Sequence, residues 1–233
     1  MRFDYLVRDL GRLPYRDAWR VQLEVHAAVA EGRERPTLLL VEHPPVLTFG
    51  RKGGREHLLV SEDEARSRGF ELFDVERGGD VTYHGPGQLV GYPILPVGRR
   101  VREYLRSLET VMVRTFAAFG LDTTGSPGYA GVWLGDEKLV AIGVAIKRNV
   151  SFHGFAMNVH TDLARFGAIV PCGLSDKGVT SLSRALGRHV AFDEVLPPLL
   201  EAFAETFHLS HAPPGAALPR EEGALPREED LVA

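Results

Sequence analysis

Cys172 is the only cysteine among the 233 residues of the chain, so it cannot form an internal disulfide bond. A single thiol either packs as a small apolar residue or acts as a nucleophile. Pro171 precedes it and Gly173 follows it, and these neighbours favour an irregular turn over the interior of a helix or strand. Backbone N–H groups in such a turn are free to face a ligand. The sequence therefore indicates Cys172 as a candidate nucleophile.

Two glycine-rich stretches carry polar residues that could complete a thiol site. Residues 77–88 (Arg-Gly-Gly-Asp-Val-Thr-Tyr-His-Gly-Pro-Gly-Gln) hold four glycines, which let the backbone approach a ligand closely. A β-hairpin with turn glycines explains this stretch equally well. Lys138 follows a Gly-Asp turn and precedes the small residues Ala141 and Gly143, although a solvated lysine is the simpler interpretation. Residues 77–88 are neither a P-loop nor a dinucleotide fingerprint, because the required spacings are missing.

A third stretch, residues 151–159, adds a histidine and an asparagine. Gly154 within a predicted strand indicates a bulge or a close neighbour. A structural role for His153 is as good an interpretation as a catalytic one, and a Cys–His–Asn thiol hydrolase stays open on residue types. None of the nine histidines has His-Glu-x-x-His spacing, and a lone cysteine cannot form Cys-x-x-Cys. We therefore predict no metal site.

The composition narrows the class of protein. An apolar content of 44% and a charged content of 25% are ordinary for a soluble globular protein. The net charge is −4, of which residues 210–233 carry −3 through two arginines and five acids, so the near-neutral body argues against broad nucleic-acid binding. No apolar run approaches the length of a membrane span, and the amino terminus does not resemble a signal peptide. We expect a cytoplasmic protein with neither a nucleic-acid nor a membrane partner.

Hydrophobic patterning predicts the elements that must position these residues. Strands are expected over 2–8, 37–41, 46–49, 70–75, 89–95, 129–133, 138–146 and 152–159, and helices over 14–30, 61–68, 101–119, 180–186 and 192–207. Because the strands come in runs, the pattern predicts the α+β class, an α/β sandwich of mixed β-sheets flanked by helices. Residues 1–209 are expected to form a single catalytic domain. Residues 210–233 repeat Leu-Pro-Arg-Glu-Glu and are expected to form a flexible tail.

Several segments, in this order along the chain, resemble the lipoyl(octanoyl) transferases, a family related to the biotin and lipoate protein ligases. They are Thr48-Phe49-Gly50-Arg51, residues 77–91, residues 131–143, residues 151–159, and Pro171-Cys172-Gly173-Leu174 followed by Thr180-Ser181-Leu182. The run Arg-Gly-Gly-x-x-Thr-Tyr-His-Gly-Pro-Gly-Gln is the most specific of them. The acidic repeat at the end of the chain lies outside the family pattern.

The resemblance implies the fold of the biotin/lipoate protein ligases and a catalytic transferase domain. The family moves an octanoyl group from octanoyl-acyl carrier protein to a lysine of a lipoyl domain, in 2-oxo acid dehydrogenase E2 subunits or the glycine-cleavage H protein, as part of lipoate biosynthesis. It uses a cysteine thioester and a nearby lysine, which match Cys172 and Lys138. The implied substrate-binding residues are Arg77, Gly78, Gly79, Asp80, Val81, Thr82, Tyr83, His84, Ala141, Ile142, Gly143, Gly154, Phe155 and Ala156.

The residue types agree with this implied reaction. Transfer from a thioester to an amide is downhill and needs neither ATP nor another cofactor, consistent with the missing P-loop. Lys138 could favour the thiolate as an ammonium, or act as a base when neutral. An octanoyl chain needs an apolar slot, for which the small residues at 141, 143, 154 and 156 are suited. Since the carrier protein is acidic, we also expect a basic rim, with Arg51, Arg77, Lys147 and Arg148 as candidates.

Three other functions stay open on the sequence. An ATP-dependent lipoate- or biotin-type protein ligase would form an acyl-adenylate, with Lys138 on phosphate and Cys172 incidental. A thiol hydrolase would release the free acid. A non-catalytic acyl-binding module would keep its function in a Cys172→Ser variant.

Overall fold

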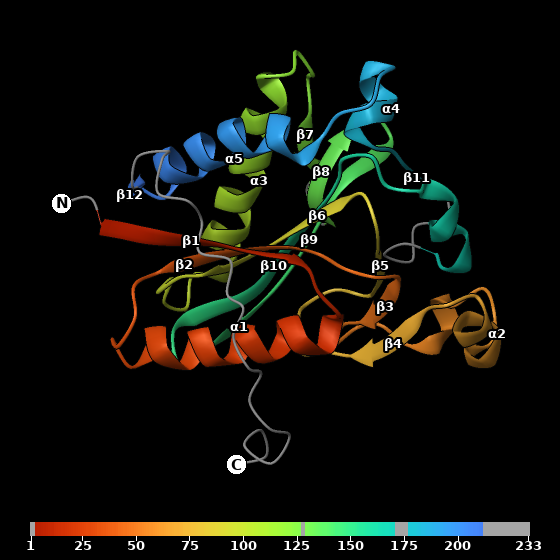
Figure 1. The fold of residues 1–233 in the computed structure, drawn as a ribbon, viewed down its shortest axis with the longest axis horizontal. Coiled ribbons are helices and arrows are strands. Elements are labelled where there is room, and N and C mark those ends of the chain that lie inside the picture. The colour runs from red at the N-terminus through yellow and green to blue at the C-terminus, as the bar shows by residue number, and fades with distance from the viewer. Residues whose placement is uncertain (1–2, 127–128, 171–176, 212–233) are drawn as a thin grey trace.

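The computed structural model describes residues 3–126, 129–170 and 177–211, and it contains two β-sheets (Figure 1). The strands are β1 (Phe3–Arg12), β2 (Thr37–Glu42), β3 (Val46–Phe49), β4 (Glu71–Asp74), β5 (Val81–His84), β6 (Gln88–Ile94), β7 (Thr124–Ser126), β8 (Tyr129–Leu134), β9 (Glu137–Lys147), β10 (Val150–Asn158), β11 (Gly178–Val179) and β12 (Leu209–His211). The helices are α1 (Tyr15–Ala30), α2 (Glu62–Ser67), α3 (Val101–Ala117), α4 (Leu182–Leu186) and α5 (Phe192–Thr206), with 3-10 turns η1 (Arg55–His57) and η2 (Leu163–Ala168).

Both sheets mix parallel and antiparallel pairing. The nine-stranded sheet has the order β12-β1-β2-β6-β10-β9-β8-β7, and β11 also pairs with β9. β1 is parallel to both β2 and β12, and β9 is parallel to β11, whereas the other pairs in this sheet are antiparallel. In the three-stranded sheet, β3 lies between β4, which is parallel to it, and antiparallel β5. The prediction of mixed sheets with flanking helices is confirmed.

Helices cover the two faces of the large sheet. Figure 1 shows α3 and α5 on one face and α1 on the other. The apolar positions of α3, among them Leu108, Met112 and Phe116, pack against the sheet in the larger core cluster. Ala18, Val25 and Val29 of α1 form a second cluster on the opposite face. Each helix thus buries the apolar stripe that its sequence pattern predicts.

The small sheet has a core of its own and is joined to the large sheet by the glycine-rich stretch. Its core contains Phe70, Tyr83 and Phe166, with Tyr83 edge-on to the other two rings. The Gly78 N–H donates to the Val144 carbonyl on β9 at 2.9 Å. Residues 77–80, which precede β5, therefore lie at the junction of the two sheets.

The sequence predicts the longer elements well and the short ones poorly. The strand predicted over 46–49 is confirmed without change, and Ser61 caps α2 by accepting a hydrogen bond from the Glu64 N–H at 3.1 Å. Four short strands were not predicted: β5, β7, β11 and β12. β12 continues to residue 211 because it pairs with β1, so the boundary expected at residue 209 falls inside this strand. None of the described helices combines the length and apolar character that a membrane crossing requires.

Candidate active site

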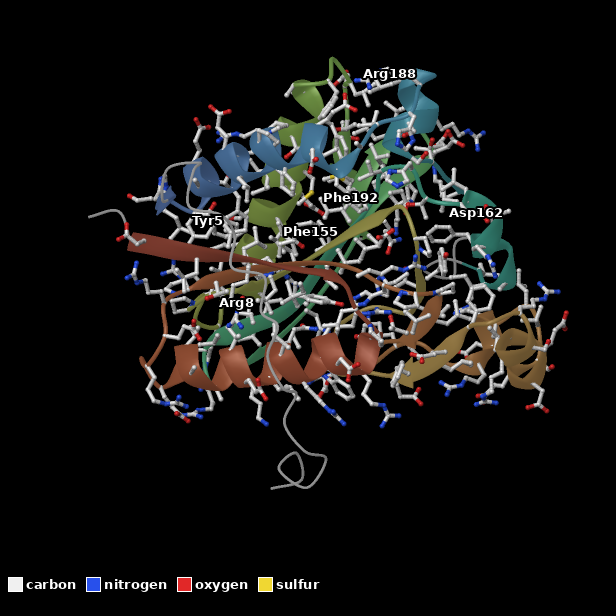
Figure 2. The ribbon with its side chains drawn as sticks, viewed as in Figure 1. Tyr5, Arg8, Phe155, Asp162, Arg188 and Phe192 are labelled. Atoms are coloured by element: carbon white, nitrogen blue, oxygen red, sulfur yellow. The ribbon has the colours of Figure 1, made fainter. Side chains whose placement is uncertain are left out.

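A cavity of about 50 Å³ lies where the glycine-rich stretch meets β9 and β10. It is lined by all the predicted substrate-binding residues except Tyr83, namely Arg77, Gly78, Gly79, Asp80, Val81, Thr82, His84, Ala141, Ile142, Gly143, Gly154, Phe155 and Ala156. Phe155 lies near the middle of the molecule in Figure 2 and is only 2% exposed. Segments that are distant in the sequence therefore meet at one buried place.

A second cavity of about 350 Å³ adjoins the first, since Gly78, Asp80 and Gly143 line both. Lys138 lines this larger cavity, together with Val101 and Leu105 from the first turns of α3. Its volume is in the range of small-molecule sites. The two cavities form a continuous candidate site with a mainly apolar wall.

Lys138 is buried on β9, with only 5% of its surface exposed. It faces Trp133 across the β8–β9 pair, and its Nζ lies 4.6 Å from the centroid of the Trp133 ring. A lysine ammonium over an indole face is a favourable cation–π arrangement. The interpretation of Lys138 as a solvated lysine after a turn is therefore wrong.

Cys172 lies outside the described residues, as does the rest of segment 171–176. The residues that flank this segment lie beside the site. The Val170 N–H donates to the His57 carbonyl at 2.8 Å, and His57 Nδ1 is 2.5 Å from Oδ2 of Asp80, which lines both cavities. On the other flank, Val179 pairs with Lys138 in the β9–β11 register.

Arg77 is buried rather than part of a rim. Its Nη2 donates to the Thr48 carbonyl at 2.7 Å and to Thr48 Oγ1 at 2.9 Å, and its Nη1 donates to the Gly78 carbonyl at 3.1 Å. A guanidinium is the cation best suited to such multiple, directed hydrogen bonds. Arg77 is therefore a structural and electrostatic part of the cavity wall, and the expectation that it belongs to an exposed basic rim is wrong.

His84 is buried beside Arg77 and held in one tautomer. Its Nδ1 is 2.8 Å from Gln88 Oε1, which can only accept, so Nδ1 carries the proton and Nε2 faces Thr48 Oγ1 as an acceptor. Burial, followed by the neighbouring His43 ring, holds the pKa of His84 well below its usual value. His84 is therefore a neutral, oriented side chain at neutral pH.

His153 occupies a strained backbone conformation at the same cavity. Its φ is +54°, a left-handed value that only a few per cent of non-glycine residues adopt. Its N–H donates to Gln22 Oε1 of α1 at 2.9 Å, and its Nε2 is 3.4 Å from Glu76 Oε2. Burial lowers the pKa of His153, whereas the hydrogen bond from His153 lowers the pKa of Glu76. A neutral imidazole donating to a carboxylate satisfies both shifts.

Tyr83 points away from the cavity. Side chains alternate along a strand, so Tyr83 of β5 faces the small core while Thr82 and His84 face the site. Burial raises the pKa of Tyr83 to about 12. Only its backbone reaches the polar side, where its carbonyl accepts from Gln88 Nε2 at 3.1 Å.

Several residues that line the site carry no signal in the sequence. Tyr15 of α1 stacks on His84 with ring centroids 6.1 Å apart, and Tyr92 of β6 lines the smaller cavity. Lys52, Val101 and Leu105 line the larger one. The scarcity of lysine, four among 27 basic residues, was the only available hint for Lys52. Within the described ranges, no cluster of three or more histidine, cysteine or acidic residues could hold a metal ion.

The buried histidines predict a loss of stability in mild acid. His43 donates from Nδ1 to the Leu13 carbonyl, accepts at Nε2 from the Tyr92 hydroxyl, and has its pKa lowered by burial to about 4. The unfolded chain therefore binds this proton below pH 6.5 while the folded chain does not, so stability is lost as the pH falls. Between pH 8 and pH 5 we expect His43 alone to remove about 2 kcal/mol from the free energy of unfolding.

Urea unfolding at both pH values measures this loss, and a His43→Asn variant should have a smaller pH dependence by the same amount. The comparison concerns the change with pH and not the absolute stability, because the substitution also removes buried hydrogen bonds. A variant with the wild-type pH dependence would contradict the assignment.

Comparison with known proteins identifies the family of this chain. The family model of the lipoyl protein ligase A/B catalytic domain matches residues 14–204. An octanoyltransferase of Caldicellulosiruptor bescii is 44% identical over 203 residues, which cover 85% of this chain and 89% of the relative. The chain belongs to the octanoyltransferase family. Octanoyltransferases are acyltransferase enzymes, and this family membership confirms the resemblance found in the motifs.

Other octanoyltransferases and a lipoate ligase structure extend the comparison. An octanoyltransferase of Deinococcus radiodurans is 50% identical over 221 residues, 88% of this chain, which spans 65% of the length of that relative. A bipartite lipoate protein ligase from Thermoplasma acidophilum, solved as part of an archaeal lipoylation system, superposes with a TM-score of 0.70. At 22% identity over 91% of this chain and 86% of that one, this likeness supports the fold alone.

Proposed function

We propose that the chain transfers an octanoyl group from octanoyl-acyl carrier protein to a lysine of a lipoyl domain, through a thioester on Cys172. The observation that carries the proposal is the buried Lys138 on the wall of an apolar cavity, in a chain of the octanoyltransferase family. The function belongs to protein lipoylation in lipoate biosynthesis, and the acceptors are the lipoyl domains of 2-oxo acid dehydrogenases and the glycine-cleavage H protein.

The proposed reaction has two steps. In the first, the Cys172 sulfur bonds to the acyl carbon, the bond to the donor sulfur breaks, and the donor thiol leaves with the cysteine proton. In the second, the amine of the acceptor lysine bonds to the acyl carbon, the bond to the Cys172 sulfur breaks, and the surplus amine proton passes to a base. Both steps form a tetrahedral oxyanion, which N–H donors stabilise. Lys138 is the cavity-lining group suited to move the proton in each step.

The flanks of segment 171–176 support the pairing of Cys172 with Lys138. Cys172 follows Val170 by two residues in the sequence. Val170 is bonded to His57 beside Asp80, a cavity residue, and Val179 pairs with Lys138. The described residues on both flanks of the segment therefore lie beside the cavity that Lys138 lines.

The cavity walls suit an aliphatic chain. Ala141, Gly143 and Ala156 line the smaller cavity together with Phe155, and Val101 and Leu105 line the larger one. Burial of the methylene groups at ~0.8 kcal/mol each would supply roughly 5 kcal/mol of binding free energy for an octanoyl chain. We propose these residues as the acyl slot, with Tyr83 contributing only through its backbone.

The proposal includes an exposed basic surface beside the cavity, formed by arginines at the start of α3 and by Lys147 and Arg148. Arg99, Arg100, Arg102 and Arg106 are all exposed near the start of α3, next to the cavity-lining Val101. The Gly98 N–H donates to the Asn149 carbonyl, so the turn that carries the exposed Lys147 and Arg148 lies alongside. Such a surface would attract an acidic carrier protein. The acylation rate should then fall as the salt concentration rises.

Intact-mass analysis tests the proposal. Incubated with octanoyl-acyl carrier protein and no ATP, the wild-type enzyme should gain the mass of one octanoyl group and lose it when a lipoyl domain is added. A Cys172→Ala variant should gain no mass. A wild-type enzyme that never gains the mass, or that transfers only with ATP, would contradict the proposal, and the second result would favour an acyl-adenylate ligase.

Product analysis separates the hydrolase alternative. Transfer should leave the octanoyl group on the lipoyl domain, whereas a hydrolase would release octanoic acid. The contacts of Asn158 argue against a Cys–His–Asn triad, because its Oδ1 accepts from Gln88 and its Nδ2 donates to the Thr180 carbonyl.

A further inference from the structure

A row of buried polar side chains runs beneath the site. It begins in the small sheet and ends on β10, the strand next to β9, which carries Lys138. Its members are Thr48 of β3, His84 of β5, Gln88 of β6 and Asn158 of β10, none more than 7% exposed. Four strands from both sheets contribute one residue each. Buried polar groups destabilise a protein unless they are fully hydrogen-bonded. The hydrogen bonds of this row therefore decide whether these residues can be buried.

The first half of the row has a single consistent hydrogen-bond direction. Arg77 Nη2 donates to Thr48 Oγ1, which leaves the Thr48 hydroxyl proton to face His84 Nε2 at 3.4 Å. His84 Nδ1–H then donates to Gln88 Oε1 at 2.8 Å. Because Oε1 is used as an acceptor, the amide nitrogen of Gln88 must face the other way.

The second half carries this direction to the strand of Lys138. Gln88 Nε2 donates to Asn158 Oδ1 at 3.0 Å, which directs Asn158 Nδ2 to the Thr180 carbonyl at 3.0 Å. The Thr180 N–H donates to the Lys138 carbonyl at 3.0 Å. The orientation of the Gln88 amide thereby fixes that of the Asn158 amide. The Asn158 amide in turn holds Thr180, which is bonded to the backbone of Lys138.

Asn158 and Lys138 also line the same small void. Lys138, Gln88 and Asn158 line one small void of about 10 Å³ beside Ala141 and Ala156 of the acyl slot. Thr180 follows β11, which leads away from segment 171–176. The Asn158 amide thus links the end of β10 to Thr180, which is bonded in turn to the backbone of Lys138 on β9.

We infer that Asn158 is a positioning residue for acyl transfer, oriented through Gln88 by His84. It holds Thr180, and through Thr180 the backbone of Lys138, in the register that places the amine against the acyl carbon. This inference rests on the proposed transferase function. Loss of the amide donor shifts Lys138 without removing it, and small displacements of a catalytic group slow a reaction by up to about 100-fold.

The variant Asn158→Asp tests the inference, because it keeps the shape of the side chain and the acceptor for Gln88 but removes the donor to Thr180. We expect kcat for transfer from octanoyl-acyl carrier protein to a lipoyl domain to fall by about 10- to 100-fold. KM for the lipoyl domain should stay within about twofold, since Asn158 touches neither substrate protein. The fraction of enzyme that gains one octanoyl group in intact-mass analysis counts the active sites, so unfolded enzyme does not lower the measured kcat.

Ser151→Ala is the matched control. Ser151 lies on the same strand and is fully buried. Its hydroxyl bonds to the backbone of Pro93 and Leu95 and to the side chain of Tyr104. It should lower the melting temperature without changing kcat per active site. A folded Asn158→Asp enzyme with wild-type kcat would overturn the inference.

A second variant covers the case in which Asn158→Asp does not fold. Gln88→Met removes the donor that orients Asn158 and should lower kcat by a similar factor. If both single variants fold, the double variant should lose little more than the larger single loss, because the two residues act as one unit. Fully additive losses would overturn the inference that Gln88 acts through Asn158. A wild-type enzyme without transfer would overturn the proposed function instead, so the two failures are distinguishable.

Discussion

Replacing Lys138 with methionine is expected to lower kcat of octanoyl transfer by about 10³-fold, the middle of the range for loss of a general acid–base group. Methionine keeps an unbranched side chain that is one atom shorter, and its thioether packs favourably against an aromatic ring such as Trp133. The fold should therefore survive while the proton-moving group is lost. Single-turnover rates for acylation of Cys172 and for transfer to the lipoyl domain measure the two steps separately.

Lys52→Met provides the control for charge. Lys52 lines the same cavity of about 350 Å³, so its removal changes the charge of the cavity by the same amount. We expect its effect on kcat to stay below about fivefold, as for a cation that acts only through screened attraction. Equal losses in both variants would show that the cavity needs positive charge and not a specific base, and would contradict the role proposed for Lys138.

Gly154→Ala is expected to destabilise the protein by more than about 4 kcal/mol, an exceptional loss for one methyl group. A Cβ at Gly154 would lie 2.2 Å from the Gly91 carbonyl oxygen and 2.5 Å from Pro93 Cδ, both on the neighbouring strand β6. Backbone in the middle of a sheet cannot move aside as a flexible side chain can. At 2–4 °C per kcal/mol for a protein of this size, the melting temperature should fall by about 10 °C or more.

Gly167→Ala is the matched control, since a Cβ there would meet nothing within 4 Å. Its melting temperature should stay within about 2 °C of the wild type. A Gly154→Ala protein as stable as this control would mean that β6 and β10 can separate without cost. That result would contradict the close approach described above.

The elements predicted from the sequence are those whose signals are local. Amphipathic repeats define α1 and α3, and Ser61 caps α2 through a residue three positions away. The cavity is lined by residues before and within β5 and by residues of β9 and β10, at positions that the family resemblance implies. Gly154 was expected to mark a bulge or a close neighbour, and the structure shows the close neighbour, with the left-handed φ at His153.

Features that depend on contacts between distant segments could not be predicted. The burial of Arg77 requires Thr48 on another strand, and the stacking of Tyr15 on His84 requires α1 to pack against the junction of the sheets. β11 and β12 are too short to leave a periodic signal. β11 pairs with the start of β9, beyond the end of the β10 pairing, and β12 pairs with β1. The row from Thr48 to Asn158 joins four strands, none of which is informative alone.

In the proposed function, β9 sets the distance between Lys138 and the acyl slot. Lys138 and the proposed acyl slot at residues 141–143 lie on this one strand, which rises by about 3.3 Å per residue. The neighbouring strands β8 and β10 pair with β9 and fix its register. Tolerance for shorter or longer fatty acids would therefore evolve by exchanging the side chains that close the slot, and not by shifting the strand.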